Sequence, residues 1–223
     1  PHTSILSKPI EQLPLNDQGV PSFIPFAIDF ILKFITSEGL FRVSGSYAHI
    51  QQLSFLFSFE QCPIPPSVTV FEAASFLTKW LSLLPTPLIT PSVVYTYFRD
   101  NSPKSVVSVL KHLDEVNRKT LAYILHILHE VVSNSDKNKM NYNNMTNCFV
   151  SFLLQTQKPH YRPYRFQTFY KTAIKLLDVS IHDFILDGPL VDELQNEEPS
   201  FVPDDRNNAP QVVYRLSLDN SHQ

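Results

Sequence analysis

Proline is frequent and glycine is rare in this chain, and this imbalance limits what it can fold into. The 223 residues include 18 prolines and four glycines. Proline interrupts helices and central strands. Between the prolines, apolar residues recur at intervals of three and four, and no stretch of useful length alternates strictly between apolar and polar residues. The pattern predicts an all-α fold, a single bundle of about nine helices.

The helical segments are predicted from this periodicity and from the breaks that proline marks. The longest segment is apolar around most of its girth, so we expect it to be central and buried. Residues 1–22 are expected to form an extended lead-in. The predicted helices span residues 24–36, 47–60, 70–84, 91–99, 103–112, 114–133, 141–154 and 166–178, with a short amphipathic end at 181–186.

Charge is unevenly distributed along the chain. Residues 1–186 carry 16 lysines and arginines against 13 aspartates and glutamates, a balance of +3, whereas residues 187–223 carry two against eight, a balance of −6. We expect a helical domain over residues 1–187 and an irregular acidic tail over residues 188–223. The body lacks the strong cationic surplus of a nucleic-acid binder, so no nucleic-acid partner is expected.

Membrane insertion and disulfide bonding are not indicated. The longest uncharged apolar run, residues 80–98, contains three prolines, which argue against a membrane-spanning helix. Cys62 and Cys148 lie far apart, and two free thiols suit a reducing compartment, so a cytoplasmic location is expected. Because the chain begins with proline rather than methionine, we expect an excerpt of a longer protein. Any membrane contact is expected to be indirect or through domains outside this sequence.

One arginine lies between two of the four glycines, within residues 38–46 (EGLFRVSGS). Glycine tolerates positive φ and close backbone approach, so this pair suits a tight loop that projects Arg42. We expect Leu40, Phe41 and Val43 to anchor the loop in the core. An anchored guanidinium, planar and permanently charged, is suited to contact the phosphates of another molecule.

The spacing alone also fits an ordinary surface arginine paired with Glu38. The block EGLFRVSGS, however, resembles the arginine-finger loop of Rho-family GTPase-activating (RhoGAP) domains, which reads EGIFRxSGS or nearly so. Residues 80–89 (WLSLLPTPLI) resemble the family's FLRELPEPLI block, and residues 138–145 (NKMNYNNM) resemble its NKMTxxNL block. Residues 8–11 and 21–31 are similar to the opening segment and first helix of the family. The resemblance covers about residues 5–187, in the family's order.

The resemblance implies a RhoGAP-like fold and a GTPase activator that works on another protein's active site. The implied partner is a Rho, Rac or Cdc42-type GTPase in its GTP-bound state, which holds the nucleotide and magnesium itself. Arg42 would be the catalytic finger, inserted in trans. Asn144 matches the family asparagine that hydrogen-bonds the partner's switch region. The domain itself is expected to need no metal or cofactor.

This sequence departs from the family at several partner-facing positions. A lysine and an arginine of the family helix fall on Thr78 and Ser82. Lys79 stands one position away, about 100° around the helix, and we assign it to GTPase binding through its flexible stem. Further on, Ser151 and Phe152 replace the Pro and Asn of the family's GPNLL block.

These departures leave an alternative function open. The Leu-Pro-Thr-Pro turn and the Ser-Phe-Leu-Leu segment also resemble the RhoGAP-like C-terminal domain of inositol polyphosphate 5-phosphatases. That domain binds GTPases and short helical peptides without activating hydrolysis. The alternative is therefore a non-catalytic GTPase- or peptide-binding module of a larger signalling or inositol-phosphatase protein.

One helix carries a group that could be mistaken for a metal site. His126, His129 and Glu130 lie three and four residues apart, but no third ligand at suitable spacing follows, and a zinc-protease helix would need histidine at Ser133. We interpret both histidines as helix-surface residues.

Overall fold

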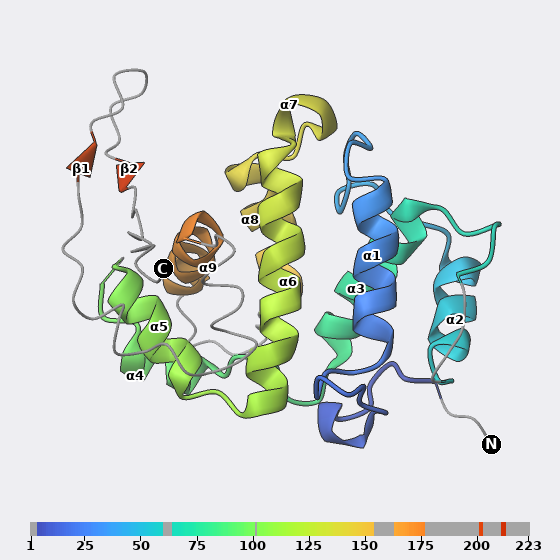
Figure 1. Ribbon diagram of the computed structural model, residues 1–223, viewed down its shortest axis with the longest axis horizontal. Helices are drawn as coiled ribbons and strands as arrows, with labels where there is room; N and C mark the ends of the chain where they lie inside the picture. The colour runs from blue at the N-terminus through green and yellow to red at the C-terminus, as the bar shows by residue number, and fades with distance from the viewer. Residues whose placement is uncertain are drawn as a thin grey trace, which may run out of the picture. The chain divides into compact units, whose positions relative to one another are not determined.

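The structure is a computed structural model that describes residues 4–59, 64–100, 102–153, 163–176, 201–202 and 211–212. The chain divides into two compact units, Pro1–Gly188 and Pro189–Gln223. The described part of the first unit is helical, which confirms the all-α prediction (Figure 1). The elements of this unit are η1 (Ile10–Gln12), α1 (Phe23–Lys33), α2 (Tyr47–Leu56), α3 (Val70–Leu83), α4 (Pro91–Tyr97), α5 (Pro103–Lys111), α6 (Glu115–Ser133), α7 (Ser135–Asn138), α8 (Tyr142–Leu153) and α9 (Pro163–Leu176).

The second unit contains two short paired strands among its described residues. Strand β1 (Phe201–Val202) pairs antiparallel with β2 (Gln211–Val212). The sequence led us to expect an irregular tail, because strands of two residues are too short to show alternation. The predicted domain boundary after residue 187 stays a prediction, since residues 177–200 lie outside the described part of the chain.

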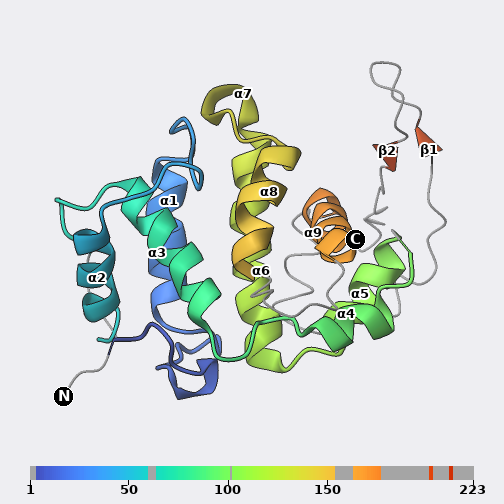
Figure 2. The ribbon, with the colours of Figure 1, turned by 180° about the vertical axis from the view of Figure 1, so that it is seen from behind.

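Helix α6 is the central element of the first unit, as its apolar girth predicts. It packs on α1, α8 and α9, and Figure 1 shows it between α1 and α9. Helix α3 packs on α1, α2 and α8, and its Trp80 is fully buried, 5.0 Å from the Phe23 ring in an edge-to-face contact. Seen from behind, α3 and α8 lie side by side on the near face (Figure 2). The residues of α6 that the core buries include Leu121, Ile124, Leu125, Leu128 and Val131.

Proline begins two of the helices, and a serine lies just beyond the end of a third. Pro91 and Pro103 begin α4 and α5, where the missing N–H costs nothing. Helix α2 ends at Leu56, earlier than the predicted residue 60, and the Ser58 hydroxyl donates to the Phe55 carbonyl just beyond it. The predicted short helix at residues 181–186 lies outside the described residues.

The first helix also ends early, at Lys33 instead of residue 36. The chain tightens there, because the N–H of Phe34 donates to the Ile31 carbonyl at 3.0 Å. The carbonyl of Ile35 is then bound by the side-chain amide of Asn138, at 3.0 Å. A distant side chain therefore ends the helix, and local periodicity gives no sign of it.

Two short helical elements were not predicted. The lead-in contains the 3₁₀ turn η1, and the one-turn helix α7 follows α6 directly. Helix α7 ends at Lys139, which adopts a left-handed conformation with φ 61°. No helix in the described part of the chain is long and apolar enough to cross a bilayer.

Candidate functional site

The loop between α1 and α2, residues 34–46, is fixed at two points that flank Arg42. On one side the N–H of Gly39 donates to the carbonyl of Asn138 at 2.8 Å. On the other side the N–H of Gly45 donates to the Ser75 hydroxyl at 2.8 Å. Arg42 stands three residues from each point. In both views the loop lies beside α7 at the same end of the unit (Figures 1 and 2).

The residue before the arginine has a strained backbone. Phe41 has φ 67°, a left-handed conformation that costs a bulky residue on the order of 1–3 kcal/mol. Its side chain is 7% exposed, and its ring meets Phe149 edge-to-face at 5.4 Å. Leu40 is fully buried beside it. These contacts offset the strain and turn the next side chain outward.

The predicted anchoring role of Val43 is wrong. Its side chain is 45% exposed, whereas Leu40 and Phe41 are buried as predicted. The N–H groups of Arg42 and Val43 both donate to the Gly39 carbonyl at 2.8 Å. This tight turn reverses the chain immediately after Phe41, so Val43 points away from the core.

Arg42 is exposed, and its guanidinium is not paired within the part of the chain that the structure describes. The expected alternative, an ion pair with Glu38, is not formed among these residues. The side chain lies over Gly39: a Cβ on that glycine would stand 3.3 Å from Nη2 of Arg42. A permanently charged fork is therefore held over a tight turn with its hydrogen-bonding capacity unused.

Asn138 connects the loop to α6 and α7. It is fully buried, its side-chain amide donates to the carbonyls of Ile35 and Val131, and its Oδ1 accepts the N–H of Met140 at 2.8 Å. Its own carbonyl is the group that binds Gly39. In the sequence this residue is recognisable only as part of a motif, and its structural role was not predicted.

Asn144 lies on the first turns of α8, close to the same connection. Its Nδ2 donates to the carbonyl of Lys139 at 2.9 Å, directly after Asn138. The side chain is half-buried, and its Oδ1 accepts no hydrogen bond from the residues that the structure describes. The structure thus brings Arg42 and Asn144 to one end of the unit through the α7–α8 connection.

The opposite side of the loop rests on the first turn of α3. Thr69 caps this helix, and the carboxylate of Glu72 returns to the Thr69 N–H and hydroxyl, which completes a capping box. The second oxygen of Glu72, Oε1, accepts the N–H of Ser46 at 3.0 Å. His49 of α2 places Nδ1 3.8 Å from the same oxygen. One buried carboxylate therefore joins α3 and the loop.

Opposing effects set the pKa of Glu72. Burial raises it, but hydrogen bonds from the Thr69 hydroxyl, the Ser46 N–H and the Thr69 N–H together outweigh burial and lower the pKa from 4.5 to about 2. Since the folded pKa lies below the unfolded one, the charged form stabilises the fold above pH 4.5. This stabilisation is lost as the pH falls from 4.5 toward 2.

We expect a measurable pH dependence of stability from this carboxylate. Between pH 5 and pH 3 the free energy of unfolding of the native domain should fall by about 2 kcal/mol more than that of Glu72→Gln. Urea denaturation at several pH values measures both. Equal slopes with pH in the two proteins would show that Glu72 is not held as a bound carboxylate.

Lys79 lies on the same stripe of α3 as the residues that hold the loop. Glu72, Ser75 and Lys79 are separated by three and four residues, which places them one above the other on a helix face. Lys79 is exposed, whereas Thr78 is 6% exposed. An exposed cation of α3 thus lies on the helix face that holds the loop.

The two other departures on α3 carry no charge toward this face. The hydroxyl of Thr78 donates to the Ser75 carbonyl at 3.0 Å, and that of Ser82 donates to the Lys79 carbonyl at 2.8 Å. Both hydroxyl groups are therefore hydrogen-bonded within their own helix. The side chains of Ser151 and Phe152 lie outside the described part.

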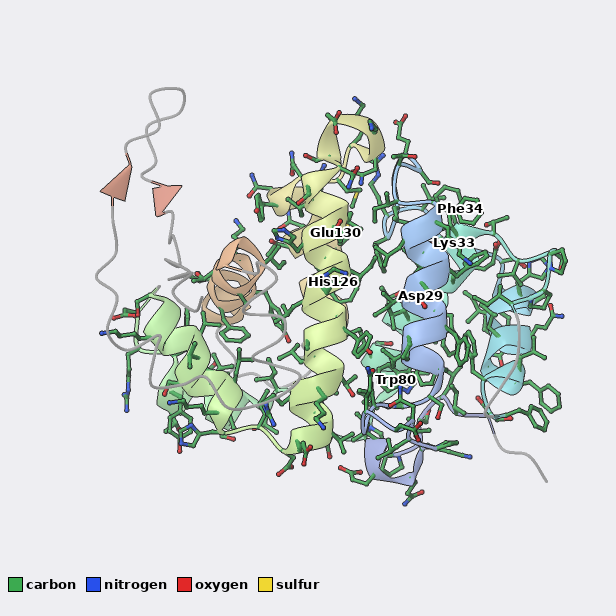
Figure 3. All side chains as sticks on the ribbon, viewed as in Figure 1. Asp29, Lys33, Phe34, Trp80, His126 and Glu130 are labelled. Carbon is green, nitrogen blue, oxygen red and sulfur yellow. The ribbon has the colours of Figure 1, made fainter. Side chains whose placement is uncertain are left out.

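The histidines of α6 lie away from the site formed by Arg42, Asn144 and Lys79. Figure 3 shows His126 and Glu130 on the near side of α6, whereas α3 and α8 are nearest the viewer only from behind (Figure 2). His129 Nδ1 lies 3.1 Å from the carbonyl of Ile174 on α9. Within the described residues, no group of three His, Cys, Asp or Glu side chains is arranged to hold a metal ion.

Comparison with known families and proteins supports the resemblance seen in the motifs. The model of the RhoGAP domain matches residues 21–158. GTPase activating protein homolog 3 of Dictyostelium discoideum is 32% identical over 142 residues, which are 59% of this chain and 10% of that protein. Rho GTPase-activating protein 22 of Mus musculus is 31% identical over 149 residues, or 61% of this chain and 21% of that protein. The chain thus spans a small part of these relatives.

Two solved structures share the fold of this chain. The BH domain from GRAF, the GTPase regulator associated with focal adhesion kinase, has a TM-score of 0.62 at 22% identity and covers 77% of this chain and 96% of that chain. Human Rho GTPase activating protein 15 has a TM-score of 0.66 at 21% identity and covers 82% and 92%. The motif-based resemblance and the helical fold are confirmed.

Proposed function

Since this chain belongs to the RhoGAP domain family, we propose that it stimulates GTP hydrolysis on a Rho, Rac or Cdc42-type GTPase by inserting Arg42 into the partner's nucleotide site. The observation that carries the proposal is the exposure of Arg42 together with its lack of a bonding partner among the described residues. Arg42 is exposed and unpaired among the described residues, on a loop fixed three residues away on either side.

The proposed chemistry is charge stabilisation, with no bond made or broken on this chain. As the γ-phosphate leaves, negative charge spreads over its oxygens, and a guanidinium can hydrogen-bond two oxygens at once. A loop already fixed before binding loses little conformational freedom when the arginine reaches the phosphates. Arginine fingers of this kind increase the rate of hydrolysis by roughly 10³- to 10⁵-fold.

Two further side chains are assigned to partner binding. Lys79 supplies a positive charge in line with the loop, and Asn144 offers its free Oδ1 to a backbone N–H of the partner. The GTP-bound state is preferred because only it carries the γ-phosphate. A cytoplasmic location remains part of this proposal.

A single-turnover assay on GTP-loaded Rho, Rac and Cdc42-type proteins tests the function. We expect the domain to raise the hydrolysis rate of at least one of them by roughly 10³-fold or more. Lys79→Ala should raise the half-saturating concentration severalfold and leave the maximal rate nearly unchanged, because an exposed charge assists encounter more than chemistry.

Lys111, an exposed lysine at the end of α5, provides the matched control. Lys111→Ala should change neither quantity. An equal effect of both substitutions would remove Lys79 from the binding face. Saturable binding without stimulation on every GTPase tested would reject the catalyst and support the non-catalytic binding module, an alternative that the uncharged Thr78 and Ser82 positions favour.

A further inference from the structure

The carboxylate of Glu72 lies where the helix cap of α3 meets the 34–46 loop. Its two oxygens serve different elements: Oε2 binds Thr69, within the cap, and Oε1 binds the N–H of Ser46, within the loop. The side chain is buried. A buried carboxylate with donors on both oxygens is fixed in orientation, and so are the groups that donate to it.

Glycine brings the loop close enough for this contact. The backbone at Gly45 is so near α3 that a Cβ there would lie 2.6 Å from the Cα of Glu72. The neighbouring Ser75, one turn further along α3, accepts the Gly45 N–H. Two consecutive N–H groups of the loop therefore donate to side chains on successive turns of α3.

We infer that Glu72 is a positioning residue for Arg42. Glu72 holds the second half of the 34–46 loop on α3 and thereby keeps the Arg42 guanidinium in one orientation. The inference rests on the proposed function. The first half of the loop is fixed independently, by Asn138 and by the buried ring of Phe41. Loss of the Ser46 bond should therefore widen the range of Arg42 positions without unfolding the loop.

Glutamine at position 72 cannot perform both duties of the carboxylate. Its amide has one accepting oxygen and one donating NH₂ group, so it can accept the Thr69 N–H or the Ser46 N–H but not both. Thr69→Ala is the matched control, because it weakens the same capping box and leaves the Ser46 bond in place. A defect caused by the weakened helix alone would appear equally in both variants.

The test measures single-turnover stimulation on the most responsive GTPase, and amide hydrogen exchange of the free domain at Ser46. We expect Glu72→Gln to lower the maximal rate about five- to thirtyfold, with the half-saturating concentration within twofold, because positioning affects the transition state more than binding. Exchange at Ser46 should accelerate at least tenfold. Thr69→Ala should leave the maximal rate and this exchange rate within twofold of the native values.

An unchanged maximal rate in Glu72→Gln overturns the inference, as does an equal loss in Thr69→Ala. These outcomes leave the proposed function intact, since the native domain still stimulates hydrolysis. Failure of the proposed function looks different: the native domain itself gives no stimulation, and the inference falls with it even if the Ser46 exchange result is as expected.

Discussion

Replacing Arg42 with alanine is expected to lower stimulated GTP hydrolysis by roughly 10³-fold or more, with the affinity for the GTP-bound partner nearly unchanged. The guanidinium makes no bond within the described part of its own chain, so its removal leaves the fold and the loop contacts in place. Lysine should not restore activity, because an ammonium lacks the planar fork that spans two phosphate oxygens.

Three measurements distinguish a catalytic loss from other causes. Thermal unfolding should give the same midpoint for the native domain and Arg42→Ala, and equilibrium binding should give similar affinities. Arg99→Ala, at an exposed arginine between α4 and α5, should retain full stimulation. Stimulation that survives in Arg42→Ala would exclude the finger mechanism.

The second large effect is expected from Gly45→Ala. The added Cβ would stand 2.6 Å from Cα and 2.8 Å from N of Glu72, and these backbone atoms of a capped helix turn cannot move cheaply. The loop must then leave α3, which breaks the hydrogen bonds of Gly45 and Ser46. We expect the maximal rate to fall about 10²-fold and the fold to lose about 1–3 kcal/mol.

Gly19→Ala controls for loss of stability without loop displacement. Gly19 has φ +74°, so alanine there is strained, yet its Cβ would meet only the flexible side chain of Lys119 at 3.6 Å. This variant should be less stable by about 1 kcal/mol and fully active in the single-turnover assay. If Gly45→Ala kept its activity, the close seating of the loop on α3 would be irrelevant to function.

The features of the fold that could be predicted are those that depend on residues close together in the sequence. Proline positions and apolar spacing gave the bounds of the main helices to within a few residues, because these signals act over one or two turns. The end of α1 was misplaced because the binding partner of Ile35 is the distant Asn138. The one-turn helix α7 is too short to show periodicity. Lys139 caps its C-terminus in a left-handed conformation, which is not expected of lysine.

The candidate site also has features that the local sequence predicts and features that depend on distant residues. The motif around Arg42 could be recognised from the sequence. Of its two glycines, Gly39 has a positive φ of 77°, whereas Gly45 allows a close backbone approach to α3. Nothing local showed that Phe41 also has a positive φ or that Val43 is exposed. The capping signature formed by Thr69 and Glu72 was visible as a Thr-x-x-Glu pattern and was overlooked. Its contact with the loop was not predictable, because it joins residues 26 positions apart.

The same limit applies to Lys79. Counting from the motif places it about 100° from the family position and weakens its assignment. The contacts of Ser75 and Glu72 with the loop show which face of α3 lies next to the finger, and Lys79 is on that face. Helix orientation is a tertiary property that counting along the sequence does not give, and the assignment of Lys79 to GTPase binding stays a prediction.

The role of Arg42 is tested by comparing the affinities of the domain for two states of the responsive GTPase. One state carries a non-hydrolysable GTP analogue, and the other carries GDP with aluminium fluoride, which mimics the phosphoryl group in transfer. If Arg42 meets charge that develops during hydrolysis, the native domain should bind the mimic at least 10²-fold more tightly, and Arg42→Ala should lose this preference. Equal affinity of the native domain for both states would show that Arg42 does not stabilise charge that develops during hydrolysis.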